Sequence, residues 1–144
     1  MIALDTDILV HAHRADSPWN ERAYEALRSL GEGRAAWGIA WPCIHEFLPT
    51  VTHPKVFRPP STLSEALREV EAWLESPSLV VMAESPDHWS RLTGLLRAGR
   101  VAGPRVHDAR IAAICLSHGV RELWTADRDF RRFPALATRN PLVE

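Results

Sequence analysis

Short apolar runs that end in polar residues alternate along this chain with segments of helical spacing. The runs at 2–5, 35–40, 79–82 and 122–125 are predicted strands, because each is brief, apolar and bounded by turn-forming residues. Between them, apolar positions recur every three or four residues, as on the buried face of a helix. The pattern predicts an α/β fold in which helical crossovers join the strands of a mostly parallel sheet.

The helices are predicted from their start and stop signals. They are expected to begin at Ser17-Pro18, at Pro42, at Ser61 or Ser64, at His88 after Ser85-Pro86-Asp87, and near residue 106, with a short helical piece at 129–134. Serine or aspartate can cap free N–H groups, and proline has the φ angle of a first helical residue. The segment 106–118 is apolar on nearly every side, which predicts a buried helix. The proline-punctuated stretch 52–60 is a predicted loop.

Four acidic residues, Asp5, Glu46, Asp108 and Asp127, lie at junctions between these elements. In a parallel sheet, the carboxyl ends of the strands and the starts of the following helices share one edge, where ligands bind. We therefore expect the four carboxylates to meet. Such a cluster of like charges is stable at neutral pH only with cations between its members. Glu46 taken alone could equally face solvent on an amphipathic helix.

The other acidic residues also have structural explanations. Asp5 and Asp7 could bond their own backbone in a turn, and Asp108 could be an aspartate favoured by the helix dipole. Asp127 and Asp129 could cap the turn that follows them. The acidic residues taken together are a more specific signal than any one of them.

Composition limits the size, location and partners of the protein. With 144 residues, 46% of them apolar, we expect a single domain over 1–144. The net charge of -1 leaves no general polyanion-binding surface, so contact with nucleic acid must come from local patches. Cys43 and Cys115 lie in apolar stretches, and no leader or membrane-length apolar run is seen, which predicts a cytoplasmic protein with buried thiols and no membrane contact.

Four motifs spread over nearly the whole chain point to a known family. They are LDTDILV, IHEFLPTVTHPKVF, HDARIAAICLSHG and TADRDFRRFPAL, in this order. The series resembles the PIN domain and, within it, the VapC-type toxin ribonucleases of bacterial toxin-antitoxin systems. The resemblance implies a three-layer α/β/α PIN-like fold, with a central, mostly parallel sheet of four or five strands flanked by helices. It also implies a metal-dependent endoribonuclease.

The resemblance carries over the catalytic acidic set as Asp5, Glu46, Asp108 and Asp127, with Thr125 as a polar neighbour. The chain departs from the family at Asp7, where many relatives have asparagine, so Asp7 could be an additional metal ligand. Asp129 could share or replace the task of Asp127.

The expected chemistry follows from oxygen ligands, which select hard cations such as Mg²⁺ or Mn²⁺. Our hypothesis makes Asp5 and Asp108 the principal metal ligands, with Asp127 in direct or water-mediated contact. Glu46 would orient or deprotonate the attacking water.

The resemblance further implies a VapB-type antitoxin, a homodimer, and an RNA substrate, whether tRNA, rRNA or mRNA. The antitoxin is expected in an apolar groove near the helices at 17–30 and 42–52, and Trp19 and Trp73 could add to a partner surface. Arginines around the rim of the site could hold the RNA backbone; they include Arg100, Arg105, Arg128, Arg131 and Arg132.

Two other functions are compatible with parts of the sequence. The Asp5-Thr6-Asp7 pattern also resembles aspartyl-phosphate phosphatases, in which the first aspartate is the nucleophile and the second an acid. Those enzymes need a lysine near the phosphoryl group, whereas the only lysine here, Lys55, lies in the proline-rich loop. The chain could also be a non-catalytic PIN module that binds a partner.

Overall fold

The computed structural model describes residues 1–144 and contains one sheet of five parallel strands. The strands are β1 (Ile2–Leu4), β2 (Trp37–Ala40), β3 (Leu79–Met82), β4 (Glu122–Trp124) and β5 (Ala137–Arg139). Their order across the sheet is β3-β2-β1-β4-β5, and every neighbouring pair is parallel. The four predicted strands and the α/β class are confirmed. The edge strand β5 was not predicted, because its three residues are exposed and form no apolar run.

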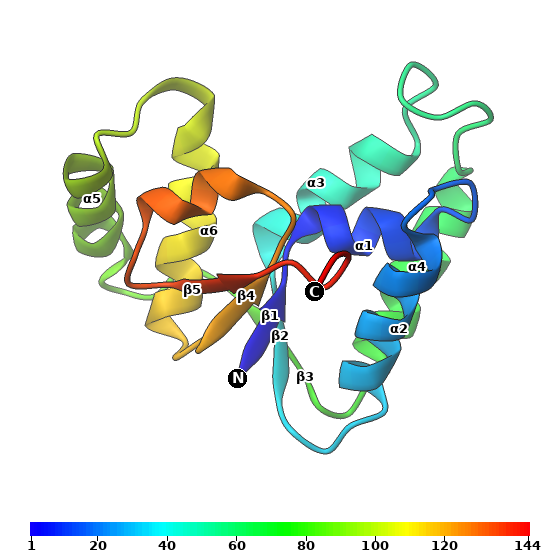
Figure 1. The fold of residues 1–144 in the computed structure, drawn as a ribbon, viewed down its shortest axis with the longest axis horizontal. Helices are drawn as coiled ribbons and strands as arrows, with labels where there is room; N and C mark the ends of the chain where they lie inside the picture. The colour runs from blue at the N-terminus through cyan, green and yellow to red at the C-terminus, as the bar shows by residue number, and fades with distance from the viewer.

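Six helices and two short 3₁₀ turns surround the sheet. They are α1 (Thr6–His13), α2 (Asn20–Gly31), α3 (Trp41–Val51), α4 (Leu63–Leu74), α5 (His88–Gly99), η1 (Gly103–Arg105), α6 (Val106–Ser117) and η2 (Arg128–Arg132). Figure 1 shows α5 and α6 on one side of the sheet and α1, α2 and α4 on the other, which is the expected three-layer arrangement. None of these helices is both long and apolar enough to cross a membrane.

The core lies between these layers. Helix α6 contributes Ala109 and the run from Ile111 to Cys115, all buried, as its apolar sequence predicted. Cys43 and Cys115 are both free and buried, and burial raises the pKa of both thiols. These two cysteines therefore behave as small apolar core residues.

Helix α1 was not predicted from the sequence. Its apolar residues Ile8, Leu9 and Val10 follow strand β1 after only three polar residues, and this run is too short to show helical spacing. The local signal is Asp5, whose side chain accepts a hydrogen bond from Thr6 N and caps the helix. Strand β1 therefore turns into α1 at the first acidic residue of the site.

Two predicted helix starts and one predicted cap need correction, while α5 begins at His88 as predicted. Helix α2 begins at Asn20 and not at Pro18, because Ser17 Oγ accepts from Trp19 N in a turn before the helix. Helix α4 is capped by Thr62, whose reciprocal bonds with Glu65 form a capping box, and not by Ser61 or Ser64. Asp87 occupies the N-cap position of α5 without capping it, because its carboxylate bonds to Ser85 and Arg91.

Candidate functional site

The four predicted acidic residues line one cavity at the carboxyl edge of the sheet. The cavity has a volume of about 370 Å³. Its walls are formed by Asp5, Thr6, Asp7, Val10, His11, Glu46, Thr50, Val56, Phe57, Asp108 and Asp127. These residues come from the end of β1, from α1, from α3 and the loop after it, from α6, and from the loop before η2. The convergence expected from the order of strands and helices is present in the structure.

Asp5 is fixed at the bottom of this cavity and is only 6% exposed. Its backbone N–H donates to Trp124 O, which extends the pairing of β1 with β4 to the edge of the sheet. Oδ2 accepts from Thr125 Oγ1 at 2.8 Å, and Oδ1 accepts from Thr6 N at 2.8 Å. Burial raises the pKa of Asp5 to about 8, with the charges of Asp7 and Glu46 acting in the same direction against these hydrogen bonds.

Asp7 also has both carboxylate oxygens bonded to backbone. Oδ1 accepts from Ile8 N at 2.8 Å, and Oδ2 accepts from Ala126 N at 2.9 Å. Burial raises the pKa of Asp7. The second of these bonds joins the first turn of α1 to the loop after β4, so Asp7 holds two walls of the cavity together in addition to any role toward a metal.

Glu46 lies in the second turn of α3 and is oriented by a residue that the sequence analysis did not single out. Thr6 Oγ1 donates to Glu46 Oε2 at 2.7 Å, while Glu46 Oε1 accepts no hydrogen bond from the protein. The only sequence signal for Thr6 is its position between Asp5 and Asp7. The hydroxyl fixes one oxygen of Glu46 and leaves the other available at the cavity.

A second group of carboxylates gathers where α6 meets η2. One oxygen from each of Asp108, Asp127 and Asp129 lies within 4.8 Å of the others. Burial, together with the charges of Asp127 and Asp129, raises the pKa of Asp108 to about 6, and the charge of Arg105 opposes the shift. Asp5 lines the same cavity as Asp108 and Asp127 without belonging to this group.

Asp127 and Asp129 differ in how they are held. Asp127 Oδ1 accepts from Asp129 N at 2.8 Å, so the capping role considered for Asp127 is present, and its backbone N–H donates to Thr125 Oγ1. Asp129 forms an ion pair with Arg105 at 3.5 Å. Of the two, only Asp127 lines the cavity that contains Asp5 and Glu46.

The donor set fits a hard divalent cation. The acidic residues that line the cavity are all carboxylates, and the one other ionisable residue there, His11, has its Nδ1 bonded to Ser17 Oγ. The donors that hold the carboxylates are threonine hydroxyls, backbone N–H groups and the thiol of Cys43. Oxygen-only ligands of this kind suit Mg²⁺ or Mn²⁺ and do not suit zinc. Burial and, after it, the neighbouring carboxylates raise the pKa values of Asp5 and Asp108, and a bound cation offsets both by stabilising the ionised forms.

The predicted rim arginines are distributed unevenly. Arg128 and Arg131 line a separate polar hollow of about 180 Å³ that shares Thr125 and Asp127 with the acidic cavity. Arg105 is paired with Asp129, as described above. Arg132 donates to Gly99 O and so joins η2 to the end of α5, and Arg100 is the left-handed C-cap residue of α5.

A more apolar groove lies between α2 and α4. It has a volume of about 450 Å³ and is lined by Tyr24, Leu27, Arg28, Gly31, Glu32, Trp37, Glu69, Ala72, Trp73, Glu75 and Ser76. One wall of this groove is α2, which lies in the segment 17–30 expected to contact a partner, and the other wall is α4. The expected contribution of 42–52 to a partner groove stays a prediction. Trp73 is 5% exposed and its indole N–H has no partner, whereas Trp19 is exposed elsewhere.

Comparisons with known proteins agree with this architecture. Residues 2–136 match the PIN domain family. Ribonuclease VapC48 of Mycobacterium tuberculosis is 28% identical over 137 residues, which cover 95% of this chain and 94% of the relative. VapC ribonuclease Mb2897 of Mycobacterium bovis is 30% identical over 142 residues, which cover 99% and 96%. The crystal structure of VapBC2 from Rickettsia felis bound to a promoter DNA fragment contains a similar fold, with a TM-score of 0.68, 21% identity, and coverage of 97% of this chain and 98% of that one.

Proposed function

This chain belongs to the PIN domain family and, within it, to the VapC ribonucleases, and we propose that it is the RNA-cleaving toxin of a bacterial toxin-antitoxin pair. One observation carries the proposal: Asp5, Glu46, Asp108 and Asp127, from four distant parts of the sequence, line a single cavity. Hydrogen bonds from Thr125 and Thr6 hold two of these carboxylates in place before any substrate binds. Such preorganisation is what a phosphoryl-transfer site requires.

In this proposal, Asp5, Asp108 and Asp127 hold Mg²⁺ or Mn²⁺. When bound, such a cation lowers the pKa of water and neutralises charge on the scissile phosphate. Thr125 keeps Asp5 turned toward the cavity by its hydrogen bond to Oδ2, and it positions Asp127 by accepting that residue's backbone N–H. Asp129 balances the charge of Arg105 beside this set.

Glu46 acts on the attacking water. Its Oε2 is anchored by Thr6, and its free Oε1 accepts a proton from the water or orients it for attack in line with the leaving oxygen of an RNA phosphodiester. Hydrolysis of that bond then needs no nucleophile from the protein. Arg128 and Arg131, next to Asp127, bind the RNA backbone beyond the cut.

The expected protein partner is a VapB-type antitoxin. The groove between α2 and α4 suits an apolar segment of such a partner, because it contains tryptophan and leucine side chains and the unpaired N–H of Trp73. A cationic residue of the antitoxin would enter the acidic cavity and replace the charge of the metal. We also propose that the toxin is a cytoplasmic homodimer.

The phosphatase alternative is disfavoured by the environment of Asp5. Both of its oxygens accept hydrogen bonds, and burial raises its pKa to about 8, which makes it a poor nucleophile at neutral pH. Lys55 lies on the exposed loop after α3. A non-catalytic module would differ from our proposal in a direct way, because it would bind its partner without cleaving RNA.

A cleavage assay with isosteric variants tests the proposal. Purified protein is incubated with structured RNA in Mg²⁺, in Mn²⁺ or in EDTA, and the expected result is metal-dependent cleavage. Asp5→Asn and Asp108→Asn should each lower the rate at least about a hundredfold, as expected for loss of a group that stabilises the transition state. The matched control is Asp87→Asn, an exposed aspartate paired with Arg91 on α5. Full activity in both site variants, with normal folding, would refute the assignment.

A further inference from the structure

The acidic cavity has a second wall of a different chemical character. Val10, Val56 and Phe57 line it together with the carboxylates, and Val56 is 54% exposed. Val56 and Phe57 belong to the loop after α3, which is otherwise polar and proline-rich. Phe57 packs against the edge of the core, whereas the exposure of Val56 in the lining of a charged site has no explanation in the packing of the core.

This loop is held in a defined conformation. His53 O accepts hydrogen bonds from both Val56 N and Phe57 N at 3.0 Å, and His53 Nδ1 accepts from Lys55 N. The guanidinium of Arg14 lies over the ring of Phe57, 4.4 Å from its centroid. One face of the ring is thus covered by Arg14, and the side chain also lines the cavity.

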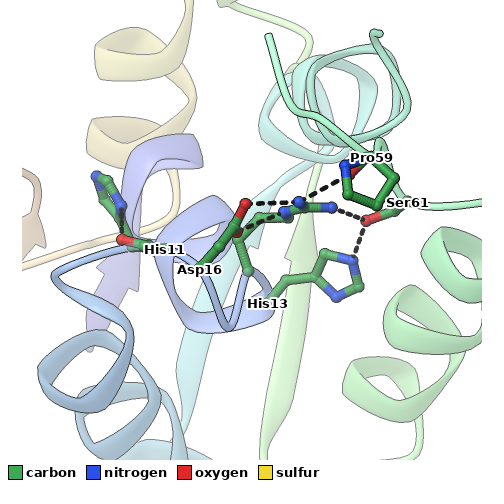
Figure 2. Close-up of polar contacts among 7 residues, drawn as sticks. His11, His13, Asp16, Pro59 and Ser61 are labelled. Atoms are coloured by element: carbon green, nitrogen blue, oxygen red, sulfur yellow. Dashed lines mark hydrogen bonds and ion pairs between the residues drawn. The ribbon is translucent and has the colours of Figure 1, made fainter.

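Arg14 is itself fixed by a network that joins α1 to the same loop. It donates to both carboxylate oxygens of Asp16, to Pro59 O at 2.9 Å, and to Ser61 Oγ at 3.1 Å. Ser61 Oγ also lies 2.8 Å from His13 Nε2, as Figure 2 shows. The side chain of Arg14 is 11% exposed, so the aromatic wall has a rigid support.

The charges beside this wall favour an anionic ligand. Lys55 and Arg58 directly flank Val56 and Phe57 in the sequence, both are exposed, and neither forms an ion pair. Arg58 lines the neighbouring hollow that also contains Arg14. A rigid aromatic side chain between free cations is the arrangement by which proteins bind single-stranded nucleic acid, with bases on the ring and phosphates on the cations. An apolar peptide would cover the side chains of Val56 and Phe57 but would leave the two cations without an anionic partner.

We propose that Val56 and Phe57 form a base-binding wall, on which an unpaired nucleobase next to the scissile phosphate packs during RNA cleavage. This inference rests on the proposed ribonuclease function and adds a residue pair that contacts the substrate base. The volume of about 370 Å³ leaves room for one such base beside the acidic residues. The substrate class is therefore RNA in which that nucleotide is single-stranded or can be flipped out of its stack.

The test compares RNA with and without the base. The wild-type protein is first incubated in Mn²⁺ with a fluorescent pool of random-sequence, single-stranded RNA. One oligonucleotide that the protein cleaves is then chosen as the substrate. The same oligonucleotide is then made with an abasic ribose on either side of the cut. Phe57→Ala should lower kcat/KM on the intact RNA about tenfold, through KM. On the RNA lacking the bound base, Phe57→Ala should cause no further loss, because the interaction is already gone.

Controls separate this effect from misfolding and from loss of the metal site. Phe57→Trp should retain cleavage, Val56→Ala should show a smaller loss than Phe57→Ala, and Mn²⁺ should raise the Tm of all variants as in the wild type. Leu63→Ala and Trp89→Ala remove exposed apolar side chains of α4 and α5, outside the cavity, and should leave kcat/KM unchanged.

Three results would overturn the inference in distinguishable ways. Wild-type protein that cuts no RNA with either metal would remove the proposed function and this inference with it. Normal wild-type cleavage, with equal losses for Phe57→Ala on intact and on both abasic substrates, would remove only the base-binding wall. Loss of antitoxin binding in Phe57→Ala with unchanged RNA cleavage would assign the wall to a protein partner and would likewise refute it.

Discussion

Thr125 Oγ1 donates a hydrogen bond of 2.8 Å to Asp5 Oδ2 across 120 positions of sequence. The same oxygen accepts the backbone N–H of Asp127 at 3.0 Å. The contact exists because β1 and β4 are paired with Leu4 opposite Trp124, so the next residue of each strand reaches the sheet edge together. One buried hydroxyl thus sets the positions of two carboxylates in the cavity.

Replacing Thr125 with valine should weaken metal binding without removing a carboxylate. The variant keeps the shape of the side chain but leaves Asp5 Oδ2 and the N–H of Asp127 without their partner. Groups that orient metal ligands typically contribute about 10- to 100-fold in affinity, and we expect a loss of Mn²⁺ affinity in that range. Calorimetric titration measures it. Thr125→Ser retains the hydroxyl and should restore most of the affinity; equal weakening in both variants would contradict the argument.

Stability in the absence of metal should fall as the pH rises from about 5 to above 8. Burial raises the pKa of Asp5 to about 8, so the folded protein retains a proton that the unfolded chain releases near pH 4. The stability that this group contributes is fully present at pH values below its unfolded-state pKa. It decreases by roughly 1.4 kcal/mol per pH unit between the unfolded-state and the folded-state pKa, and it is gone above the folded-state pKa. Asp108, with its pKa raised to about 6, acts in the same direction.

Urea denaturation in EDTA at several pH values checks this prediction. The informative comparison is with Asp5→Asn, which cannot titrate and should have a flatter profile and a higher stability at pH 8. Mn²⁺ should flatten the wild-type profile as well, since a bound cation stabilises the ionised carboxylates. A wild-type profile parallel to that of Asp5→Asn would show that Asp5 does not carry a raised pKa.

The sequence predicted the parts of the fold whose signals are local. The strands near β1, β2, β3 and β4 were recognisable as isolated apolar runs, and the buried helix α6 by its apolar residues on every side. Helix α1 was missed because its apolar residues follow Asp5, Thr6 and Asp7 as a short run, which is too brief to show helical spacing. The exposed strand β5 depends on pairing with β4, which no local pattern encodes.

The site was predicted to a similar extent. Topology alone placed Asp5, Glu46, Asp108 and Asp127 at one edge, since strand ends and helix starts must meet there. The groups that orient them were harder to predict. Thr6 contacts Glu46 only because α1 packs against α3, and such a contact is a property of packing between distant segments.

Asp127 should matter more for cleavage than Asp129. Both carboxylates lie near Asp108, but only Asp127 lines the cavity with Asp5 and Glu46, while Asp129 is engaged by Arg105. We expect Asp127→Asn to lower kcat at least tenfold more than Asp129→Asn. Single-turnover cleavage in Mn²⁺ measures the difference. The reverse order would make Asp129 the fourth acidic residue of the site and Asp127 chiefly the cap of η2.

Arg14 should stabilise the loop that carries Val56 and Phe57 more than it stabilises the rest of the fold. Its guanidinium donates hydrogen bonds to Asp16, Pro59 O and Ser61 and covers the ring of Phe57. Arg14→Leu therefore removes all the contacts by which the guanidinium connects the end of α1 to this loop.

A hydrogen bond to a charged group such as the Arg14 guanidinium contributes about 1.5–3 kcal/mol when both partners are buried. Because Asp16 is exposed, its bond contributes less, and we expect Arg14→Leu to lower the free energy of unfolding by about 2 kcal/mol in all. Arg14→Lys keeps the charge without the planar fork and should recover less than half of that loss. Native-state hydrogen exchange locates the effect: the amides of Val56 and Phe57, both bonded to His53 O, should exchange faster, while those of α6 should keep their relative protection. A uniform loss of protection over α6 and the loop would show that Arg14 supports the whole domain and that the wall does not depend on it specifically.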